Sequence, residues 1–262
     1  MAKGVSIKFR SYSETVPRLL ELINLGKELK KHSKIVLKPS LRVPEGEKSL
    51  STPVAFAEQV LRFCLRNKNP VTEIFIADGT DGADTMELFN QLGYAKLAER
   101  YNVGLIDLNN TGTEKIEEED FLRFQQIMYP KILKESFVIS MPLLAEEEET
   151  DMLGALSNML GAFPASQYKG FFSKIKSKIR RWPIKYSIHD ILKCKMPEFA
   201  IVDSSEKGVI LAGLPLEVDK QASKLLGLEW KDVGHIRLVE ESFLDEPEDE
   251  KKEEVANIPS TS

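Results

Sequence analysis

The sequence of 262 residues is poor in the side chains that most often hold metals and clusters, with only two cysteines and three histidines. Cys64 and Cys194 form no CxxC spacing and cannot supply the four thiolates of an iron–sulfur cluster or a four-cysteine zinc site. His32, His189 and His235 are too isolated to indicate a catalytic pair, and GxSxG and HExxH motifs are absent. We therefore expect no iron–sulfur cluster and ordinary roles for the histidines.

Long apolar segments are also missing. No run approaches the ~18 to 20 uncharged apolar residues that a transmembrane helix needs. The first ten residues, MAKGVSIKFR, contain no apolar core of the kind found in a secretion signal. The sequence therefore predicts a cytoplasmic protein without a membrane span.

Charge is unevenly distributed along the chain, whose formal net charge is −5. Residues 244–262 contain seven acidic residues and two lysines, so this segment carries the whole net charge and residues 1–243 sum to zero. The segment has no apolar periodicity that could offset its ordering entropy. We predict a single α/β domain over residues 1–243 and a disordered acidic tail over residues 244–262.

Short apolar segments alternate with segments of helical periodicity. Strands are predicted at 5–9, 35–37, 72–77, 103–108, 137–141, 199–202 and 209–211. Helices are predicted over 16–29, 54–65 and around 86–100. This alternation predicts an α/β fold, with a parallel or mixed sheet and helices on both faces.

Ligands in such folds bind beyond the carboxyl ends of the strands. Lys38 follows the second predicted strand, and Pro39 fixes the backbone direction just beyond it. A desolvated lysine there could act as a base, an anion anchor or a Schiff-base former. The alternative is a surface lysine whose stem lies over the rim of the sheet.

The third predicted strand ends in a loop rich in aspartate and glycine, made of Asp78, Gly79, Asp81, Gly82 and Asp84. Its backbone amides could hold an anion, whereas its carboxylates could hold a cation. The loop has neither the GxxxxGK[ST] phosphate-loop spacing nor the EF-hand spacing. The alternative is an ordinary helix start, with Asp81 or Asp84 as the N-cap.

Residues 169–185 contain seven basic residues and no acidic one, with apolar residues at steps of three and four. This pattern predicts a basic amphipathic helix. It could bind a nucleic acid, an anionic lipid surface or acidic segments of the protein itself. The candidate surface for a polyanion or partner consists of Lys174, Lys176, Lys178, Arg180 and Arg181.

Several short motifs occur in an order typical of one known family. They are Lys38-Pro39-Ser40-Leu41, Ser51-Thr52-Pro53, Asp78 to Thr85, Leu92-Gly93-Tyr94, Ile139-Ser140-Met141-Pro142, Ser157-Asn158-Met159-Leu160-Gly161, Ile201-Val202-Asp203 and Leu214 to Asp219. On these motifs the chain resembles, over roughly residues 4–230, the family called domain of unknown function 362. The resemblance implies a site at the strand ends and adds Asn158, Asp203 and Asp219 to its candidate residues.

The chain departs from the family pattern at three polar positions. Where the family usually has Lys-x-His after the proline, this chain has Ala145 and Glu147, and Ser157 replaces the lysine before Asn158. Family members often carry a ferredoxin-like segment with iron–sulfur clusters, whose cysteines this chain lacks. Replacing cations by carboxylates would change an anion site into one suited to a cation or to no ligand.

Two functional hypotheses follow. In the first, a strand-end cleft binds a small anionic or metal-associated ligand through Lys38, Asp78, Asp81, Asn158, Asp203 and Asp219. Lys38 would anchor an anion, while Asp78, Asp81 and Asp203 are the candidate ligands of a divalent metal and Asp78 with Asp203 the candidate bases. In the second, the chain is a non-catalytic module that binds a protein partner or nucleic acid through residues 169–185. Both leave enzymatic activity, the cofactor and homo-oligomerisation open.

Overall fold

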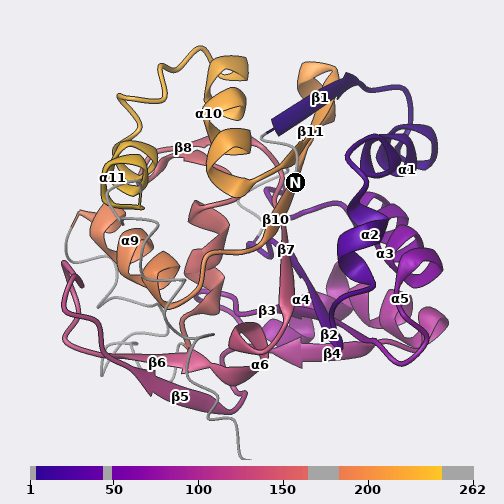
Figure 1. The fold of residues 1–262 in the computed structure, drawn as a ribbon, viewed down its shortest axis with the longest axis horizontal. Coiled ribbons are helices and arrows are strands. Elements are labelled where there is room, and N and C mark those ends of the chain that lie inside the picture. The colour runs from indigo at the N-terminus through magenta and orange to yellow at the C-terminus, as the bar shows by residue number, and fades with distance from the viewer. Residues whose placement is uncertain (1–3, 44–48, 165–182, 244–262) are drawn as a thin grey trace, which may run out of the picture.

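The computed structural model describes residues 4–43, 49–164 and 183–243 (Figure 1). The predicted acidic tail, at residues 244–262, lies outside the described residues. So does nearly all of the predicted basic helix, including its five candidate residues from Lys174 to Arg181. Among the described residues, no helix has the length and apolar character needed to cross a membrane.

A seven-stranded, mainly parallel sheet forms the centre of the fold, in the order β1-β11-β10-β7-β2-β3-β4. The five strands from β10 to β4 are parallel, and β11 runs antiparallel to both β10 and β1. The strands are β1 (Gly4–Lys8), β2 (Lys34–Pro39), β3 (Glu73–Asp78), β4 (Gly104–Asp107), β7 (Phe137–Met141), β10 (Phe199–Ser204) and β11 (Val209–Gly213). All seven predicted strands are confirmed.

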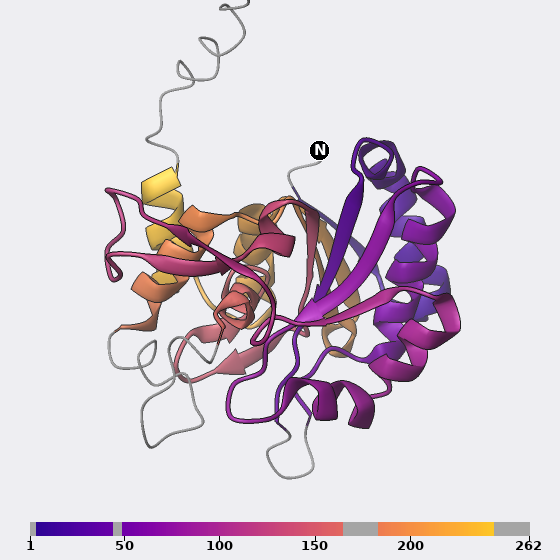
Figure 2. The ribbon, with the colours of Figure 1, turned by 90° about the horizontal axis from the view of Figure 1, so that it is seen from below.

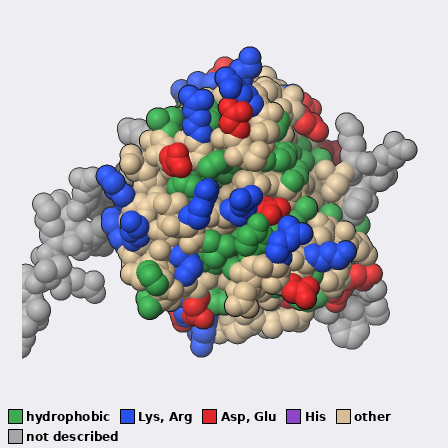
Figure 3. Space-filling view, turned by 90° about the vertical axis from the view of Figure 1, so that its right-hand side faces the viewer, with side chains coloured by type: hydrophobic (Ala, Val, Ile, Leu, Met, Phe, Trp, Pro, Cys, Tyr) green, Lys and Arg blue, Asp and Glu red, His purple; other side chains and the backbone are tan. Residues whose placement is uncertain are grey.

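Helices cover both faces of this sheet, as predicted (Figure 2). One face packs against α1 (Tyr12–Leu22), α2 (Leu25–Leu29), α3 (Val54–Asn67), α4 (Thr85–Gln91) and α5 (Tyr94–Tyr101). The other packs against η1 (Ser157–Ala162), α9 (Ile184–Cys194), α10 (Pro215–Leu225) and α11 (Gly234–Phe243). On the outer side of the first helical layer, lysine and arginine side chains are spread over the face, with apolar areas and scattered acidic side chains between them (Figure 3).

Alternation of side chains along each strand separates the two cores. In β2, Ile35 and Leu37 point toward α1 and α3, whereas Val36 points toward the layer of α9 to α11. In β10, Ile201 belongs to the first core and Val202 to the second. Lys38 and Asp203 at the strand ends follow this alternation and lie on opposite faces of the sheet.

Two predicted helices are each divided in two by a residue in the left-handed region. Asn24, with φ 57°, separates α1 from α2, and Gly93, with φ 87°, separates α4 from α5. Such a conformation ends a right-handed helix, and glycine and asparagine adopt it at lower cost than other residues. Helices therefore occupy both predicted ranges, 16–29 and 86–100, but each range contains two helices separated by a break.

Two hairpins and two short helices were not predicted, and none of the predicted helix ranges corresponds to η1, α9, α10 or α11. The hairpins join β5 (Thr113–Ile116) to β6 (Ile127–Pro130) and β8 (Ala145–Glu147) to β9 (Asp151–Leu153). The short helices are α6 (Lys131–Lys134) and η2 (Ser205–Lys207). The β8–β9 hairpin matters for the site, because Glu147 at the end of β8 reaches the pocket described below.

Candidate functional site

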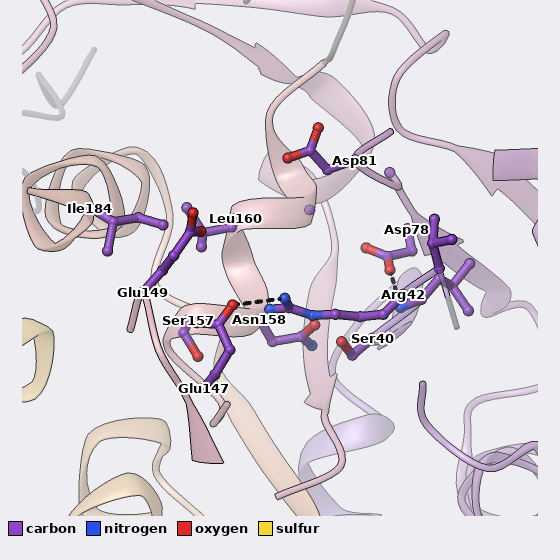
Figure 4. Close-up of a pocket in the computed structure, with 14 residues that line it drawn as sticks. Ser40, Arg42, Asp78, Asp81, Glu147, Glu149, Ser157, Asn158, Leu160 and Ile184 are labelled. Carbon is purple, nitrogen blue, oxygen red and sulfur yellow. Dashed lines mark hydrogen bonds and ion pairs between the residues drawn. The ribbon is translucent and has the colours of Figure 1, made fainter. Parts of the chain in front are cut away.

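A pocket of about 150 Å³ opens at the carboxyl ends of β2 and β3. Its walls come from the loops after these two strands, the end of the β8 strand, η1 and the first residue of α9 (Figure 4). The residues that line it are Ser40, Leu41, Arg42, Val43, Asp78, Gly79, Asp81, Glu147, Glu149, Ser157, Asn158, Leu160, Gly161 and Ile184. The pocket thus lies where a parallel sheet is expected to bind ligands.

Lys38 lies beneath this pocket rather than in its lining, with no exposed surface. Its Nζ donates to Oδ1 of Asp78 at 2.6 Å, to the carbonyl of Asn158 at 2.8 Å and to Oδ1 of Asn158 at 3.3 Å. These three acceptors match the three donors of an ammonium group. Burial lowers the pKa of Lys38 from its ordinary value, and the charge of Asp78 opposes this effect.

The Lys38 contacts join distant parts of the chain. Asn158 also donates from Nδ2 to the carbonyl of Lys38 and to Oγ of Ser140, each at 3.0 Å, so its amide is fully used within the protein. Lys38 and Ser140 are neighbours in the register of β2 and β7. Lys38 and Asn158 therefore hold η1 against the end of the sheet and set the position of one pocket wall.

Asp78 connects this buried cluster to the pocket. Its Oδ1 faces Lys38, and its Oδ2 accepts from the backbone N–H of Leu41 at 2.8 Å. The backbone of Gly161 presses against the ion pair, because a Cβ there would overlap with Oδ1 of Asp78 and lie 2.6 Å from Nζ of Lys38. Only glycine fits at this position without displacing the pair.

Ser40 presents a hydroxyl group without a hydrogen-bond partner. Thr52 satisfies both backbone groups of Ser40, yet none of the described residues bonds to the Ser40 hydroxyl. The residue is only 7% exposed and lines the pocket. Because the Ser40 side chain lines the pocket and its oxygen is not among the fully buried atoms that lack a partner, the hydroxyl marks a place where a ligand or water can bind.

Arg42 extends across the pocket to Glu147 (Figure 4). Its Nη1 lies 3.1 Å from Oε1 of Glu147. The other carboxylate oxygen, Oε2, accepts from the backbone N–H of Thr150 at 2.9 Å and from its hydroxyl at 2.6 Å. Burial by itself raises the pKa of Glu147, but the bonds from Thr150 and the charge of Arg42 outweigh it and hold the pKa below its ordinary value.

The structure brings together some of the predicted site residues but not all. Asp78, Asp81 and Asn158 line the pocket, and Lys38 lies directly below it. Asp203 lies on the opposite face of the sheet, where it accepts from the Tyr12 hydroxyl at 2.7 Å. Within the described ranges, no group of three or more His, Cys, Asp or Glu side chains could hold a metal ion.

Asp219 is fully buried in α10 and holds η1 from behind. Its carboxylate accepts from the backbone N–H groups of Ala155 at 2.7 Å and Leu156 at 2.9 Å. Burial raises the pKa of Asp219 to about 7, while these two bonds act in the opposite direction. Its position indicates an influence on the pocket through the placement of Asn158, not through contact with a ligand.

Sequence reasoning overlooked Ser40, Arg42 and the pairing of Glu147. Ser40 and Arg42 lie within the polar loop after Lys38-Pro39, so their proximity to a strand end was a usable signal. No local signal links Arg42 to Glu147, because the two residues are 105 positions apart. Glu147 was singled out only as a departure from the family pattern, and it proves to be part of the pocket lining.

Comparisons with known proteins place the fold and the family. No curated protein matches the chain. The solved structure of the lactate racemase apoprotein from Thermoanaerobacterium thermosaccharolyticum is similar, with a TM-score of 0.55 and 15% sequence identity. The similarity covers 85% of this chain but 57% of that protein, and at this identity it supports the α/β fold alone.

The family is identified by a match between residues 35–209 and the family model described as Domain of unknown function (DUF362). This range contains β3, η1, all of β2 except its first residue, and every described residue that lines the pocket. It covers well over half of the 262 residues. The chain therefore belongs to the DUF362 family.

Proposed function

We propose that this protein binds a small polar organic molecule in the pocket at the ends of β2 and β3. The observation that carries the proposal is the hydroxyl of Ser40, which lines this pocket and bonds to none of the residues that the structure describes. A hydroxyl that faces a pocket can donate a hydrogen bond to a ligand, which then takes the place of the water that would otherwise accept it.

The size of the pocket supports a small ligand. Engineered cavities of about 150 Å³ accept a molecule of the size of benzene, and the pocket has a volume of about 150 Å³. Its lining offers hydrogen-bond donors at Ser40 and Arg42 and carboxylate acceptors at Asp78 and Asp81. The ligand is therefore expected to carry both acceptor and donor groups.

The predicted site residues divide into two roles in this proposal. Asp78 and Asp81, together with Ser40 and Arg42, contact the ligand. Lys38 and Asn158 act as positioning residues, because their polar side-chain atoms are already bonded to each other, to Asp78 and to Ser140. The neighbouring structure is named a lactate racemase, and lactate is a small molecule of this kind, but the proposal does not depend on that similarity.

A thermal-shift screen of the full chain tests the proposal. The panel consists of small carboxylates, small amines and polyols, nucleotides, divalent cations and short nucleic acids. A ligand that binds only the folded state raises the melting temperature by mass action. We expect a small polar organic molecule to raise it, and the rise to shrink in the Ser40→Ala variant.

The matched control is Ser13→Ala, which changes an exposed serine on α1 far from the pocket and should leave the shift intact. A screen without any organic hit would contradict the proposal, as would a hit that Ser40→Ala leaves unchanged. Shifts caused only by nucleic acid would favour the alternative function through residues 169–185.

A further inference from the structure

We infer that the pocket binds a small carboxylic acid through the guanidinium group of Arg42. Glu147 binds this group when the ligand is absent and therefore competes with the carboxylate of the ligand. The inference rests on the proposed function and narrows it to one class of ligand. It draws on the Arg42–Glu147 contact and on the charges of the pocket lining.

The contact between Arg42 and Glu147 leaves most of the guanidinium group available. Only Nη1 donates to Glu147, at 3.1 Å, and no other described residue bonds to the guanidinium. An arginine presents five N–H donors in a fixed plane and binds carboxylates best through two parallel bonds. The single bond to Glu147 therefore leaves most N–H donors of Arg42 available to a ligand.

Glu147 can lose this bond without losing its place. Its second oxygen is held by the N–H of Thr150 at 2.9 Å and by the Thr150 hydroxyl at 2.6 Å. Its side chain is 16% exposed, so water can solvate the oxygen that Arg42 releases. When a ligand carboxylate replaces Glu147 as the partner of Arg42, Glu147 loses one charged contact. Its carboxylate is not left buried without hydrogen-bond partners.

The charges of the described lining favour a single carboxylate over a multiply charged anion. Arg42 is the only cation among the lining residues, because Lys38 lies below the pocket and is bonded to Asp78. Four carboxylates, those of Asp78, Asp81, Glu147 and Glu149, line the pocket beside this one guanidinium group, so an ammonium group on the ligand would offset part of the repulsion. A phosphate dianion would meet more repulsion from these carboxylates than a monoanion would.

Ser40 and Asp78 define the remaining contacts. The Ser40 hydroxyl lines the same pocket as Arg42 and can donate to the second face of the ligand carboxylate. Asp78 and Asp81 can accept from a hydroxyl or amino group elsewhere on the ligand. The class that fits is a small monocarboxylate with one such donor group, such as a hydroxy acid or an amino acid.

Isothermal titration of the full chain with lactate, alanine and acetate tests the inference. We expect lactate or alanine to bind more tightly than acetate, which lacks the donor group. Glu147→Gln should then raise the affinity for the bound acid about tenfold, because the ligand no longer displaces a charged contact. Arg42→Ala should abolish binding.

The matched controls are Glu58→Gln and Arg100→Ala, which break an Arg–Glu pair outside the pocket and should leave the affinity unchanged. The melting temperature of each variant without ligand separates loss of folding from loss of binding. An unchanged or reduced affinity of Glu147→Gln overturns the role of Glu147 as a competitor. Binding that survives Arg42→Ala overturns the carboxylate assignment.

Failure of the inference and failure of the proposed function remain distinguishable. If a neutral or cationic molecule binds, depends on Ser40 and is indifferent to Arg42, the proposed function stands and the carboxylate inference falls. If none of the three acids binds, the carboxylate inference falls by itself. If the whole thermal-shift panel is silent as well, both fall.

Discussion

Nζ of Lys38 lies 2.6 Å from Oδ1 of Asp78, and both side chains are almost completely shielded from solvent, at 0% and 4% exposure. The two residues end neighbouring parallel strands, so the ion pair closes the edge of the sheet directly beneath the pocket. Such a pair is sensitive to the loss of one partner, because the remaining charge stays buried.

Replacing Lys38 by methionine is expected to destabilise the protein by about 3–5 kcal/mol, because Asp78 then loses its countercharge. Urea unfolding at neutral pH measures this change. The double variant Lys38→Met with Asp78→Asn should recover part of the loss, because the asparagine is neutral and still accepts from the N–H of Leu41. Equal stability of Lys38→Met and the parent protein would contradict the importance of the pair.

Gly161→Ala should disturb the same pair from above. Its Cβ would overlap with Asp78 and approach Nζ of Lys38 to 2.6 Å, so we expect a loss of about 1–3 kcal/mol and weaker ligand binding. Gly112→Ala is the matched control, because a Cβ at Gly112 meets no atom within 4 Å. Thermal unfolding of both variants, with and without ligand, checks the prediction, which fails if they behave alike.

Asp219→Ala should loosen η1 without removing any residue that lines the pocket. The variant leaves the backbone N–H groups of Ala155 and Leu156 without their acceptor, at a cost of about 1–3 kcal/mol. Ligand affinity should fall as well, because Asn158 lies only two residues beyond Leu156. Asp232→Ala, at an exposed position, provides the comparison. Unfolding and ligand-binding measurements on both variants check the prediction. An unaltered ligand affinity of Asp219→Ala would show that the placement of this segment does not affect the pocket.

Protonation of His235 is expected to destabilise the fold in acid. Burial lowers the pKa of His235 to about 4 from 6.5, although the carbonyl of Thr150 and the charge of Glu147 favour the protonated ring. Between these two pKa values the unfolded chain binds a proton that the folded chain does not. This contribution to stability is therefore complete above pH 6.5 and is lost as the pH falls toward 4.

The size of the effect follows from the shift of the pKa. It amounts to about 3 kcal/mol at most, and His235→Leu should remove it from the pH dependence. Urea unfolding of both proteins across this pH range gives the comparison. If the difference in stability between the two proteins stays constant with pH, His235 does not titrate as described.

The sequence predicted the strands and the layered fold because these features depend on local patterns of burial. Ile35 to Leu37 and Phe137 to Met141 are short apolar segments that remain buried in any parallel sheet covered on both faces. The same logic placed Lys38 and Asp78 at strand ends. It did not show that β2 and β3 are neighbours, and only this neighbourhood makes the two residues an ion pair.

The tertiary structure alone decided which polar residues meet. Asp203 lies one position beyond Val202 and therefore points to the face of Tyr12, whereas Lys38 points to the face of η1. Asn158 reaches Lys38 across 120 positions of sequence, and Glu147 reaches Arg42 across 105. The sequence determined the elements and their polar ends through periodicity, which is a local property. The pairing of those ends depends on strand order and loop paths, which many weak long-range contacts fix together.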